Sequence, residues 1–291
     1  MPPMANQQPQ QQPDVRRLLK ARRSEVAKVA VAALHKIVFD SDDPSAPYTL
    51  YTLKLRSETR TDMTQTIVQG DGKCDWKLRK RYSEFHALYM KLRRWKGEWE
   101  QCCLDSGNMF EHLAAVLQKA IGPEFPRKHV RYDTSKIIQE RHGGLTDFIR
   151  VLLAVYTDLE VLLSAAGSQG VRTERGKGED EGACLHQIFL ELERFLEIPP
   201  KRKELEARLT RAVLALKDAA AVDKTASCCI CLSESDPSGA EADDSMVRLP
   251  CSHGFHEDCI ISWFHCSATC PICRQGVVST GSGSTRRMSI G

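Results

Sequence analysis

The spacing of apolar residues changes along the chain, and the change predicts where strands give way to helices. Residues 26–39 and 48–56 carry continuous or alternating apolar side chains rich in β-branched and aromatic types, a pattern typical of strands. Residues 63–82 add a third such segment, and their Gly-Asp-Gly at 70–72 supplies turn chemistry. Together these segments predict a three-stranded meander.

Helical spacing takes over after the third predicted strand. Residues 83–95 begin at Ser83, a candidate N-cap. The apolar face of this helix comprises Phe85, Leu88, Tyr89 and Leu92. Further helices are predicted over residues 109–121, 146–156 and 185–198. The Gly/Ser- and charge-rich residues 165–183 predict a loop between the last two.

A connecting helix is predicted over residues 200–224, directly after this mixed region. Its apolar residues fall roughly on one side, and they are Leu205, Leu209, Val213 and Leu216. Such a helix suits a simple spacer at least as well as a dimerisation helix, so a homodimer is one of two open assemblies.

Composition bounds these readings without naming a partner. The 291 residues are long enough for two domains, and a net charge of +3 is too small to identify a ligand by itself. No stretch approaches the roughly 20 apolar residues that cross a bilayer. The Gln/Pro-rich start lacks the apolar core of a secretory signal, so residues 1–25 are expected to be a disordered tail with a basic helical segment, and the protein is not expected to be secreted.

Cysteine usage indicates metal rather than disulfides. Eight of the twelve cysteines lie between residues 228 and 273, in a chain expected to stay in a reducing compartment. The ligand order there is Cys228-x-x-Cys231, then Cys251-x-His253-x-x-His256-x-x-Cys259, then Cys270-x-x-Cys273. Zinc prefers four tetrahedral ligands, and the segment 251–259 would be strained if it closed on one ion. Alternating use avoids that strain. One zinc ion is then held by Cys228, Cys231, His256 and Cys259, and the other by Cys251, His253, Cys270 and Cys273.

This spacing, with the wording "CCICL", "VRLPCSHGFHEDCI" and "CPICRQ", resembles the two-histidine RING finger over about residues 225–276. The resemblance implies a cross-brace fold with two structural Zn²⁺ ions and a surface that binds a ubiquitin-conjugating enzyme charged with ubiquitin. It places Ile230, Trp263 and Pro271 on that docking surface and makes Arg274 the linchpin that holds the thioester for attack. No cysteine nucleophile is implied. The alternative reading makes Trp263 a core residue and Arg274 a solvated charge.

A basic run lies at the junction of the third strand and the first predicted helix. Residues 77–96 hold eight Lys and Arg against one acid, Glu84, which by itself fits a solvated helix face. A separate basic cluster follows at "FPRKH", however, and Arg141 lies just ahead of an apolar helix. Nucleic acid is not expected as a partner, because Trp76 and Tyr82 fit core positions and the pI of 8.2 is low for nucleic-acid-binding proteins.

These features resemble the PX (phox homology) domain, a phosphoinositide-binding module of three strands packed on helices. The resemblance assigns Arg81 and Tyr82 of "KRYSEF" to the 3-phosphate and the inositol ring. It assigns Lys128 to the 1-phosphate and Arg141 to the inositol hydroxyls. The domain would span residues 26–199, with insertions near 97–122 and 165–183.

The expected fold class is α+β: a PX-like domain, a helical linker, a RING-type zinc finger and a flexible tail at 277–291. The expected function is a RING-type ubiquitin-protein ligase that a phosphoinositide, expected to be phosphatidylinositol 3-phosphate, recruits to endosomal or vacuolar membranes from the cytoplasm. The alternative is a phosphoinositide-binding sorting or tethering adaptor with a non-catalytic RING.

Overall fold

The computed structural model describes residues 13–39, 47–57, 74–102, 117–122, 125–129, 133–168, 178–219, 227–232 and 245–277. The described chain divides into two compact units, and the division falls after Lys203. Both units contain helices and an antiparallel sheet, which confirms the α+β class. The predicted tail beyond residue 277 and the N-terminal residues 1–12 lie outside the described residues, as does most of the predicted helix at 109–121.

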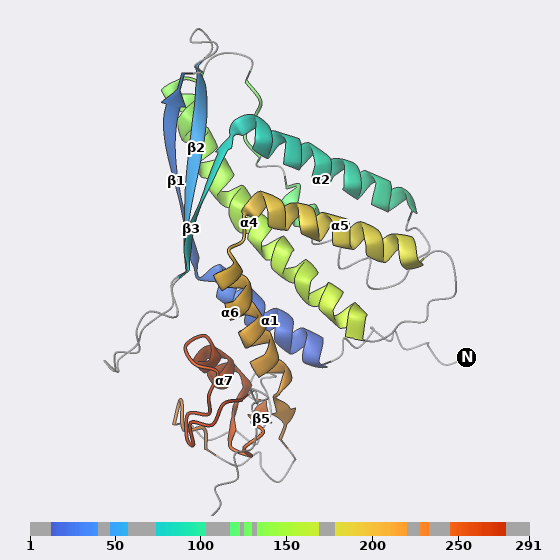
Figure 1. Cartoon of the computed structure of the whole chain (residues 1–291), viewed down its shortest axis with the longest axis vertical. Coiled ribbons are helices and arrows are strands. Elements are labelled where there is room, and N and C mark those ends of the chain that lie inside the picture. The colour runs from blue at the N-terminus through green and yellow to red at the C-terminus, as the bar shows by residue number, and fades with distance from the viewer. Residues whose placement is uncertain are drawn as a thin grey trace, which may run out of the picture. The chain divides into compact units, whose positions relative to one another are not determined.

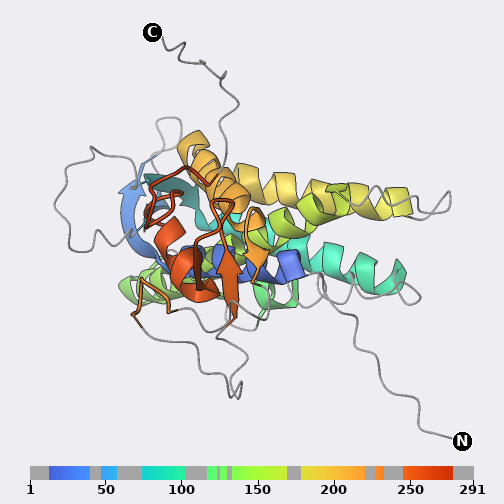
Figure 2. The ribbon, with the colours of Figure 1, turned by 90° about the horizontal axis from the view of Figure 1, so that it is seen from below.

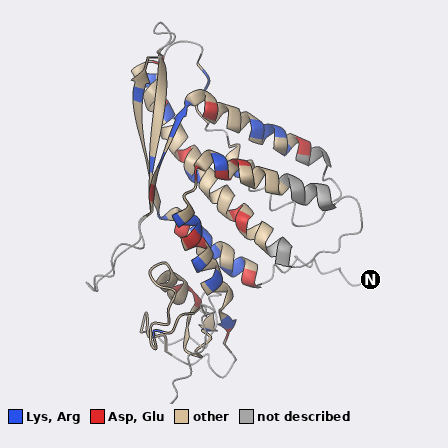
Figure 3. Cartoon of the chain, in the orientation of Figure 1, with Lys and Arg blue, Asp and Glu red and all other residues tan. Residues whose placement is uncertain are grey.

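The first unit contains the predicted meander. Strands β1 (Val29–Val38), β2 (Tyr48–Ser57) and β3 (Asp75–Arg81) pair antiparallel in the order β1-β2-β3. Leu53 at the centre of β2 faces Ala33 on β1 and Leu78 on β3. Alternate residues of β2 on this side of the sheet, Tyr51, Leu53 and Leu55, are at most 1% exposed. This inner face therefore forms the base of the core, while Lys and Arg line β3 on the other parity (Figure 3).

Three helices cover the inner face of the sheet. Helices α2 (Tyr82–Cys102), α4 (Ser135–Ser168) and α5 (Gly178–Leu196) extend from the same side of the sheet (Figures 1 and 2). Trp76 of β3 donates its indole N–H to the carbonyl of Leu196 at 3.1 Å, which fastens the end of α5 to the sheet. The core between them contains Phe85, Leu88, Leu92, Leu145, Ile149, Leu152, Ile188 and Leu192.

Helix α2 begins one residue earlier than predicted, and a different side chain caps it. The helix starts at Tyr82, and Glu84 accepts a hydrogen bond from the backbone N–H of Arg81 at 2.7 Å. A carboxylate at the third helical position that reaches back to the N-cap N–H is one half of a capping box. Ser83 was predicted as the cap, but it lies inside the first turn.

Helix α4 is longer than predicted at both ends. Residues 146–156 were expected to be helical, whereas the helix runs from Ser135 through Gly143 and Gly144 to Ser168. Paired glycines cost roughly 1 kcal/mol each in a helix interior. Burial of the apolar side chains from Leu145 onward stabilises the helix by more than this cost. The predicted loop at 165–183 is therefore helical at its two ends, and residues 169–177 lie outside the described residues.

Residues 13–27 form helix α1 (Pro13–Ala27), which packs on α4 and is not a tail. Leu18, Leu19 and Ala21 are buried, and Arg22 is fully buried. Arg22 pairs with Glu160 of α4 and, at 3.3 Å, with Glu25. Arg23 donates two hydrogen bonds of 2.8 Å to Asp158. The helix of this basic segment was expected from the sequence, but its packing was not, because the charges of α1 look solvated until their partners on α4 are known.

The second unit begins within the predicted linker. Helix α6 (Pro200–Leu214) ends ten residues before the predicted boundary at 224, and β4 (Lys217–Asp218) then joins β5 (Met246–Arg248) and β6 (Gly254–His256) in a second sheet. Helix α7 (Glu257–Phe264) follows β6 directly. On α6 and just beyond it, Leu209, Val213 and Leu216 are buried, so most of the side expected for a dimer is already covered within the chain.

Candidate functional sites

Eight Cys and His side chains of the second unit gather into two groups of four. The first group is Cys228, Cys231, His256 and Cys259, and the second is Cys251, His253, Cys270 and Cys273. Within each group all ligand atoms lie within 4.8 Å of one another. The grouping is the alternating one described above, so residues distant in sequence share a group and neighbours such as His253 and His256 do not.

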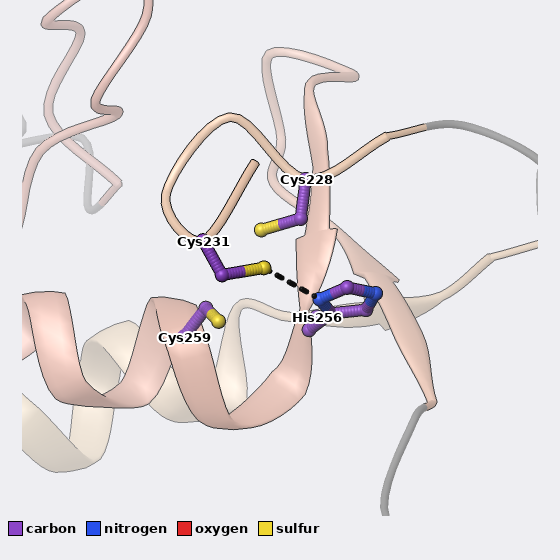
Figure 4. A group of neighbouring side chains, drawn as sticks. All are labelled: Cys228, Cys231, His256 and Cys259. Carbon is purple, nitrogen blue, oxygen red and sulfur yellow. Dashed lines mark hydrogen bonds between the residues drawn. The ribbon is translucent and has the colours of Figure 1, made fainter. Parts of the chain in front are cut away.

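The distances between ligand atoms within each group fit tetrahedral coordination of one cation. Sγ of Cys231 lies 3.2 Å from Nδ1 of His256 (Figure 4). Nδ1 of His253 lies 3.3 Å from Sγ of Cys251 and 3.6 Å from Sγ of Cys270. Zinc–ligand bonds of about 2.0–2.3 Å place tetrahedral ligand atoms roughly 3.3–3.8 Å apart. Three thiols and one imidazole in each group are the ligands zinc prefers, so each group can hold one zinc ion.

Two equivalent turns position the Cys-x-x-Cys pairs. The backbone N–H of Leu232 donates to the carbonyl of Cys228 at 2.7 Å, and that of Arg274 donates to the carbonyl of Cys270 at 2.9 Å. Both Leu232 and Arg274 adopt positive φ, 62° and 60° respectively. Each turn bends the chain so that both thiols of the pair face one point.

The sheet and helix supply the remaining ligands. His256 ends β6 and is the N-cap of α7, and Cys259 follows in the first turn of α7, so both side chains face the same side. Cys251 and His253 lie in the tight connection between β5 and β6. There Ser252 has φ 68°, and its N–H donates to the carbonyl of Leu249 at 2.8 Å.

The protonation of the thiols depends on a bound cation. Burial and the neighbouring thiols of Cys231 and Cys228 raise the pKa of Cys259 to about 12. Burial also raises the pKa of Cys251. A thiol with a pKa as high as that of Cys259 stays protonated at neutral pH, whereas zinc deprotonates the thiols that bind it. Each set of four ligands therefore suits a metal ion, because its three thiolates would repel one another without a cation between them.

An exposed apolar surface lies around the zinc-ligand loops. Trp263 on α7 is 36% exposed and donates its indole N–H to the carbonyl of Thr269 at 2.9 Å. Ile230 and Pro271 are half-buried, and Arg274 is exposed. Two apolar residues that the sequence analysis did not single out are also exposed, Leu232 at 82% and Ile272 at 51%. Their positions next to metal ligands could have indicated this exposure, because so small a unit has little hydrophobic core in which the neighbours of a ligand can be buried.

In the first unit, Arg141 is buried, and its Nε makes no hydrogen bond with any residue that the structure describes. Its guanidinium lies 3.8 Å from the centre of the Tyr82 ring, and its Nη1 donates to Asp133 at 2.6 Å. Arg141 was expected just ahead of a helix, but it lies in the second turn of α4. Burial raises the pKa of Tyr51, and the nearby Arg141 partly opposes that rise. The cation thus stands between two tyrosines and one carboxylate.

The segment at 125–129 lies against Tyr82. The Tyr82 hydroxyl donates to the carbonyl of Pro126 at 2.6 Å, and Phe125 stacks on Tyr89 of α2 at 4.3 Å. Lys128 is exposed two residues after Pro126. The structure therefore brings Arg141, Tyr82 and the segment that carries Lys128 together.

Arg81 points elsewhere. It is exposed on the outer parity of β3, and its guanidinium lies 3.3 Å from the centre of the Tyr48 ring on β2. A pair that the sequence did not reveal lies beside Arg141: Nδ1 of His35 on β1 is 3.1 Å from Nε2 of His142 on α4. Burial and the charge of His35 lower the pKa of His142. No sequence signal joins two histidines so far apart in the chain.

Comparison with known proteins identifies both units. Residues 226–274 match the family model described as Ring finger domain, and residues 68–159 match the PX domain. The chain is 37% identical over 60 residues to the E3 ubiquitin-protein ligase Iruka of Drosophila melanogaster, covering 21% of this chain and 14% of that protein. It is 39% identical over 69 residues to the RING-H2 finger protein ATL2 of Arabidopsis thaliana, covering 22% of this chain and 21% of that protein.

A longer match is with the E3 ubiquitin-protein ligase SIRP1 of Oryza sativa subsp. japonica, 25% identical over 162 residues, covering 52% of this chain and 48% of that protein. The chain thus spans less than half the length of each of these relatives. No solved structure matches the chain. The predicted combination of a PX domain and a C-terminal RING finger is confirmed. None of the described helices is long and apolar enough to cross a bilayer.

Proposed function

We propose that this protein is a RING-type ubiquitin-protein ligase that a phosphoinositide recruits to membranes. The observation that carries the proposal is the pair of four-ligand Cys/His groups, with Trp263 and Arg274 exposed beside them. Relatives that match the chain over 60 and 95 residues are described as E3 ubiquitin-protein ligases.

The two zinc ions act as structural ions. Each would have four protein ligands and so no open position for a substrate or an activated water. Zinc binding stabilises a unit that is too small to have a large hydrophobic core. The apparent binding free energy is roughly 10–16 kcal/mol for each structural zinc. Chemistry must therefore come from the surface that they hold in shape.

That surface would bind a conjugating enzyme that carries ubiquitin as a thioester. Ile230, Trp263 and Pro271 would supply the apolar contacts. The planar guanidinium of Arg274 would bond ubiquitin and its carrier together, which holds the thioester in a conformation ready for attack. The substrate lysine then attacks the thioester carbonyl, and the carrier cysteine leaves as the thiol. No covalent ligase intermediate forms.

The PX domain would recruit the protein to a membrane by binding a phosphoinositide. Arg81 and Tyr82 would bind the 3-phosphate and the inositol ring, Lys128 the 1-phosphate, and Arg141 the inositol hydroxyls. Phosphatidylinositol 3-phosphate is the proposed lipid, and endosomal or vacuolar membranes are the proposed location. In support, Tyr82, Arg141 and the Lys128 segment lie together. Arg81 would have to leave the Tyr48 ring to bind the 3-phosphate.

Discharge of ubiquitin from a charged conjugating enzyme onto free lysine tests the ligase. The zinc-loaded protein should accelerate discharge, Arg274→Ala should remove at least 90% of that acceleration, and Lys217→Ala, which removes another exposed cation of the same unit, should not. If no enzyme in a broad panel of conjugating enzymes is stimulated, the protein is a phosphoinositide-binding adaptor.

Pull-down on liposomes that contain phosphatidylinositol 3-phosphate tests the proposed membrane recruitment. The Arg81→Ala variant should no longer bind these liposomes, while its discharge activity stays intact.

A further inference from the structure

The outer face of the first sheet carries an unusual concentration of positive charge. Because side chains alternate along a strand, residues of one parity on β1, β2 and β3 share this face. Its cations are Lys36, Lys54, Arg56, Lys77, Arg79 and Arg81, all exposed, and its one acid is Asp75. The formal charge of the face is therefore +5, larger than the +3 of the whole chain.

The strand register places like charges side by side. Lys54 on β2 is directly opposite Lys77 on β3, and Arg79 follows Lys77 on the same face. Like charges at directly opposite positions destabilise a sheet. Of the six cations, Arg56 pairs with Asp75 at 3.4 Å and Arg81 covers the Tyr48 ring. The side chains of the other four make no ion pair or hydrogen bond with any residue that the structure describes.

A membrane cannot account for all of this charge. Of the proposed headgroup residues, Arg81 ends β3 and Tyr82 begins α2. Lys77 lies four residues back along the strand, about 13 Å at 3.3 Å per residue. The Debye length at physiological ionic strength is about 8 Å. A bilayer engaged at Arg81 would therefore leave the Lys54–Lys77 pair outside its effective reach.

Single-stranded nucleic acid fits the face poorly as well. Sheets that bind single strands present aromatic rings on which bases stack. Tyr48 is the one aromatic residue of this parity on the described strands, and the Arg81 guanidinium already covers it. The face offers cations without stacking platforms.

We propose that this outer face binds an extended acidic segment of a partner protein. Along β3 the cations Lys77, Arg79 and Arg81 recur at every second residue. Carboxylates at every second residue of an extended peptide repeat at the same spacing, about 6.6 Å, so the two charge rows can align. We infer further that the outer face selects substrates that carry Asp/Glu-rich stretches, and this inference rests on the proposed ligase function. The lipid site then remains free to bind the membrane.

Fluorescence anisotropy of a labelled twelve-residue peptide of alternating Glu and Ser tests the surface on the zinc-loaded full chain. The double variant Lys54→Glu/Lys77→Glu should weaken binding at least tenfold. The matched control Arg93→Glu/Arg94→Glu changes the net charge equally at two exposed positions of α2 and should weaken binding less than twofold. Equal losses, or no binding by the wild type at low salt, would overturn the proposal.

Two competing ligands and one activity readout complete the test. A twelve-nucleotide RNA that binds more tightly than the peptide, with the same dependence on Lys54 and Lys77, would overturn it in favour of nucleic acid. Phosphatidylserine vesicles without phosphoinositide that show that dependence would overturn it in favour of a membrane surface. Discharge onto free lysine should be unchanged in the Lys54→Glu/Lys77→Glu variant. Absence of discharge in the wild type would defeat the ligase and leave the peptide result standing.

Discussion

Leu232 and Arg274 occupy equivalent positions in the two zinc-ligand turns. Each follows the second cysteine of a Cys-x-x-Cys pair, each has φ near +60°, and each donates its N–H to the carbonyl of the first cysteine. The left-handed region costs a residue with a Cβ roughly 1–2 kcal/mol. Both turns therefore hold strain, and in one of them the strained residue is the proposed linchpin.

Replacing either residue by glycine should relieve this strain. Leu232→Gly and Arg274→Gly should leave the stability of the zinc-loaded protein unchanged or raise it by up to about 1 kcal/mol, because the gain is partly offset by the greater freedom of glycine in the unfolded chain. Thermal unfolding checks this. Arg274→Gly should nevertheless lose ubiquitin discharge, whereas Leu232→Gly should lose much less. If Arg274→Gly unfolds at a lower temperature than the wild type, its loss of activity cannot be assigned to the guanidinium.

Adjacent cysteines should differ in their effect on zinc content. Cys228→Ser removes a ligand of the first group and should lower the zinc content from two ions to one or fewer, with partial unfolding of the second unit. Cys229→Ser is the control, because Cys229 is exposed and belongs to neither group. Zinc content by mass spectrometry and near-ultraviolet circular dichroism report both effects. Equal zinc loss in the two variants would contradict the ligand assignment.

Arg141→Ala should affect lipid binding and stability together. The guanidinium bonds Asp133 and covers the Tyr82 ring, so its removal should cost about 2 kcal/mol of stability and weaken binding to phosphatidylinositol 3-phosphate liposomes at least tenfold. Arg150→Ala is the control on the same helix, because Arg150 is exposed and pairs only locally with Asp147. Urea unfolding and liposome co-sedimentation measure the two effects. Full lipid binding by a folded Arg141→Ala protein would remove Arg141 from the headgroup site.

The His35–His142 pair should make the first unit sensitive to acid. Burial lowers the pKa of His142 in the folded protein, so below its ordinary value of about 6.5 the unfolded state binds more protons. This contribution to stability is therefore present above about pH 6.5 and is lost as the pH falls through the folded pKa. Urea unfolding between pH 7.5 and 5.5 should show a smaller decline for His142→Gln than for the wild type. His186→Gln, at an exposed position on α5, should decline as the wild type does. Identical slopes for all three proteins would contradict the assignment.

The local patterns in the sequence predicted the sheet and the metal groups well. Period-two apolar spacing requires one face of each strand to be buried, and that requirement located β1 and β2 to within a few residues. Ligand spacing constrained the two Cys/His groups in the same way. What could not be predicted depends on contacts between distant segments. Arg22 looks like a solvated charge until Glu160 is placed beside it, and His35 gives no sign of His142. The helix was expected only from residue 146, whereas α4 runs through Gly143 and Gly144, because the burial that offsets the cost of these glycines is a tertiary effect.

The ion pairs of α1 bear on how small a fragment of this protein can fold. Glu25 forms ion pairs with two buried arginines, Arg22 of α1 and Arg202 in the first turn of α6. A fragment cut at residues 26 and 199, the limits that the sequence pattern indicates, would lack both arginines and the carboxylate between them. It would also leave Asp158 and Glu160 of α4 without their arginine partners and expose the apolar surface that α1 covers. The shortest autonomous piece that contains the proposed lipid site should therefore begin at Pro13 and continue past Arg202, well outside the span of the PX match.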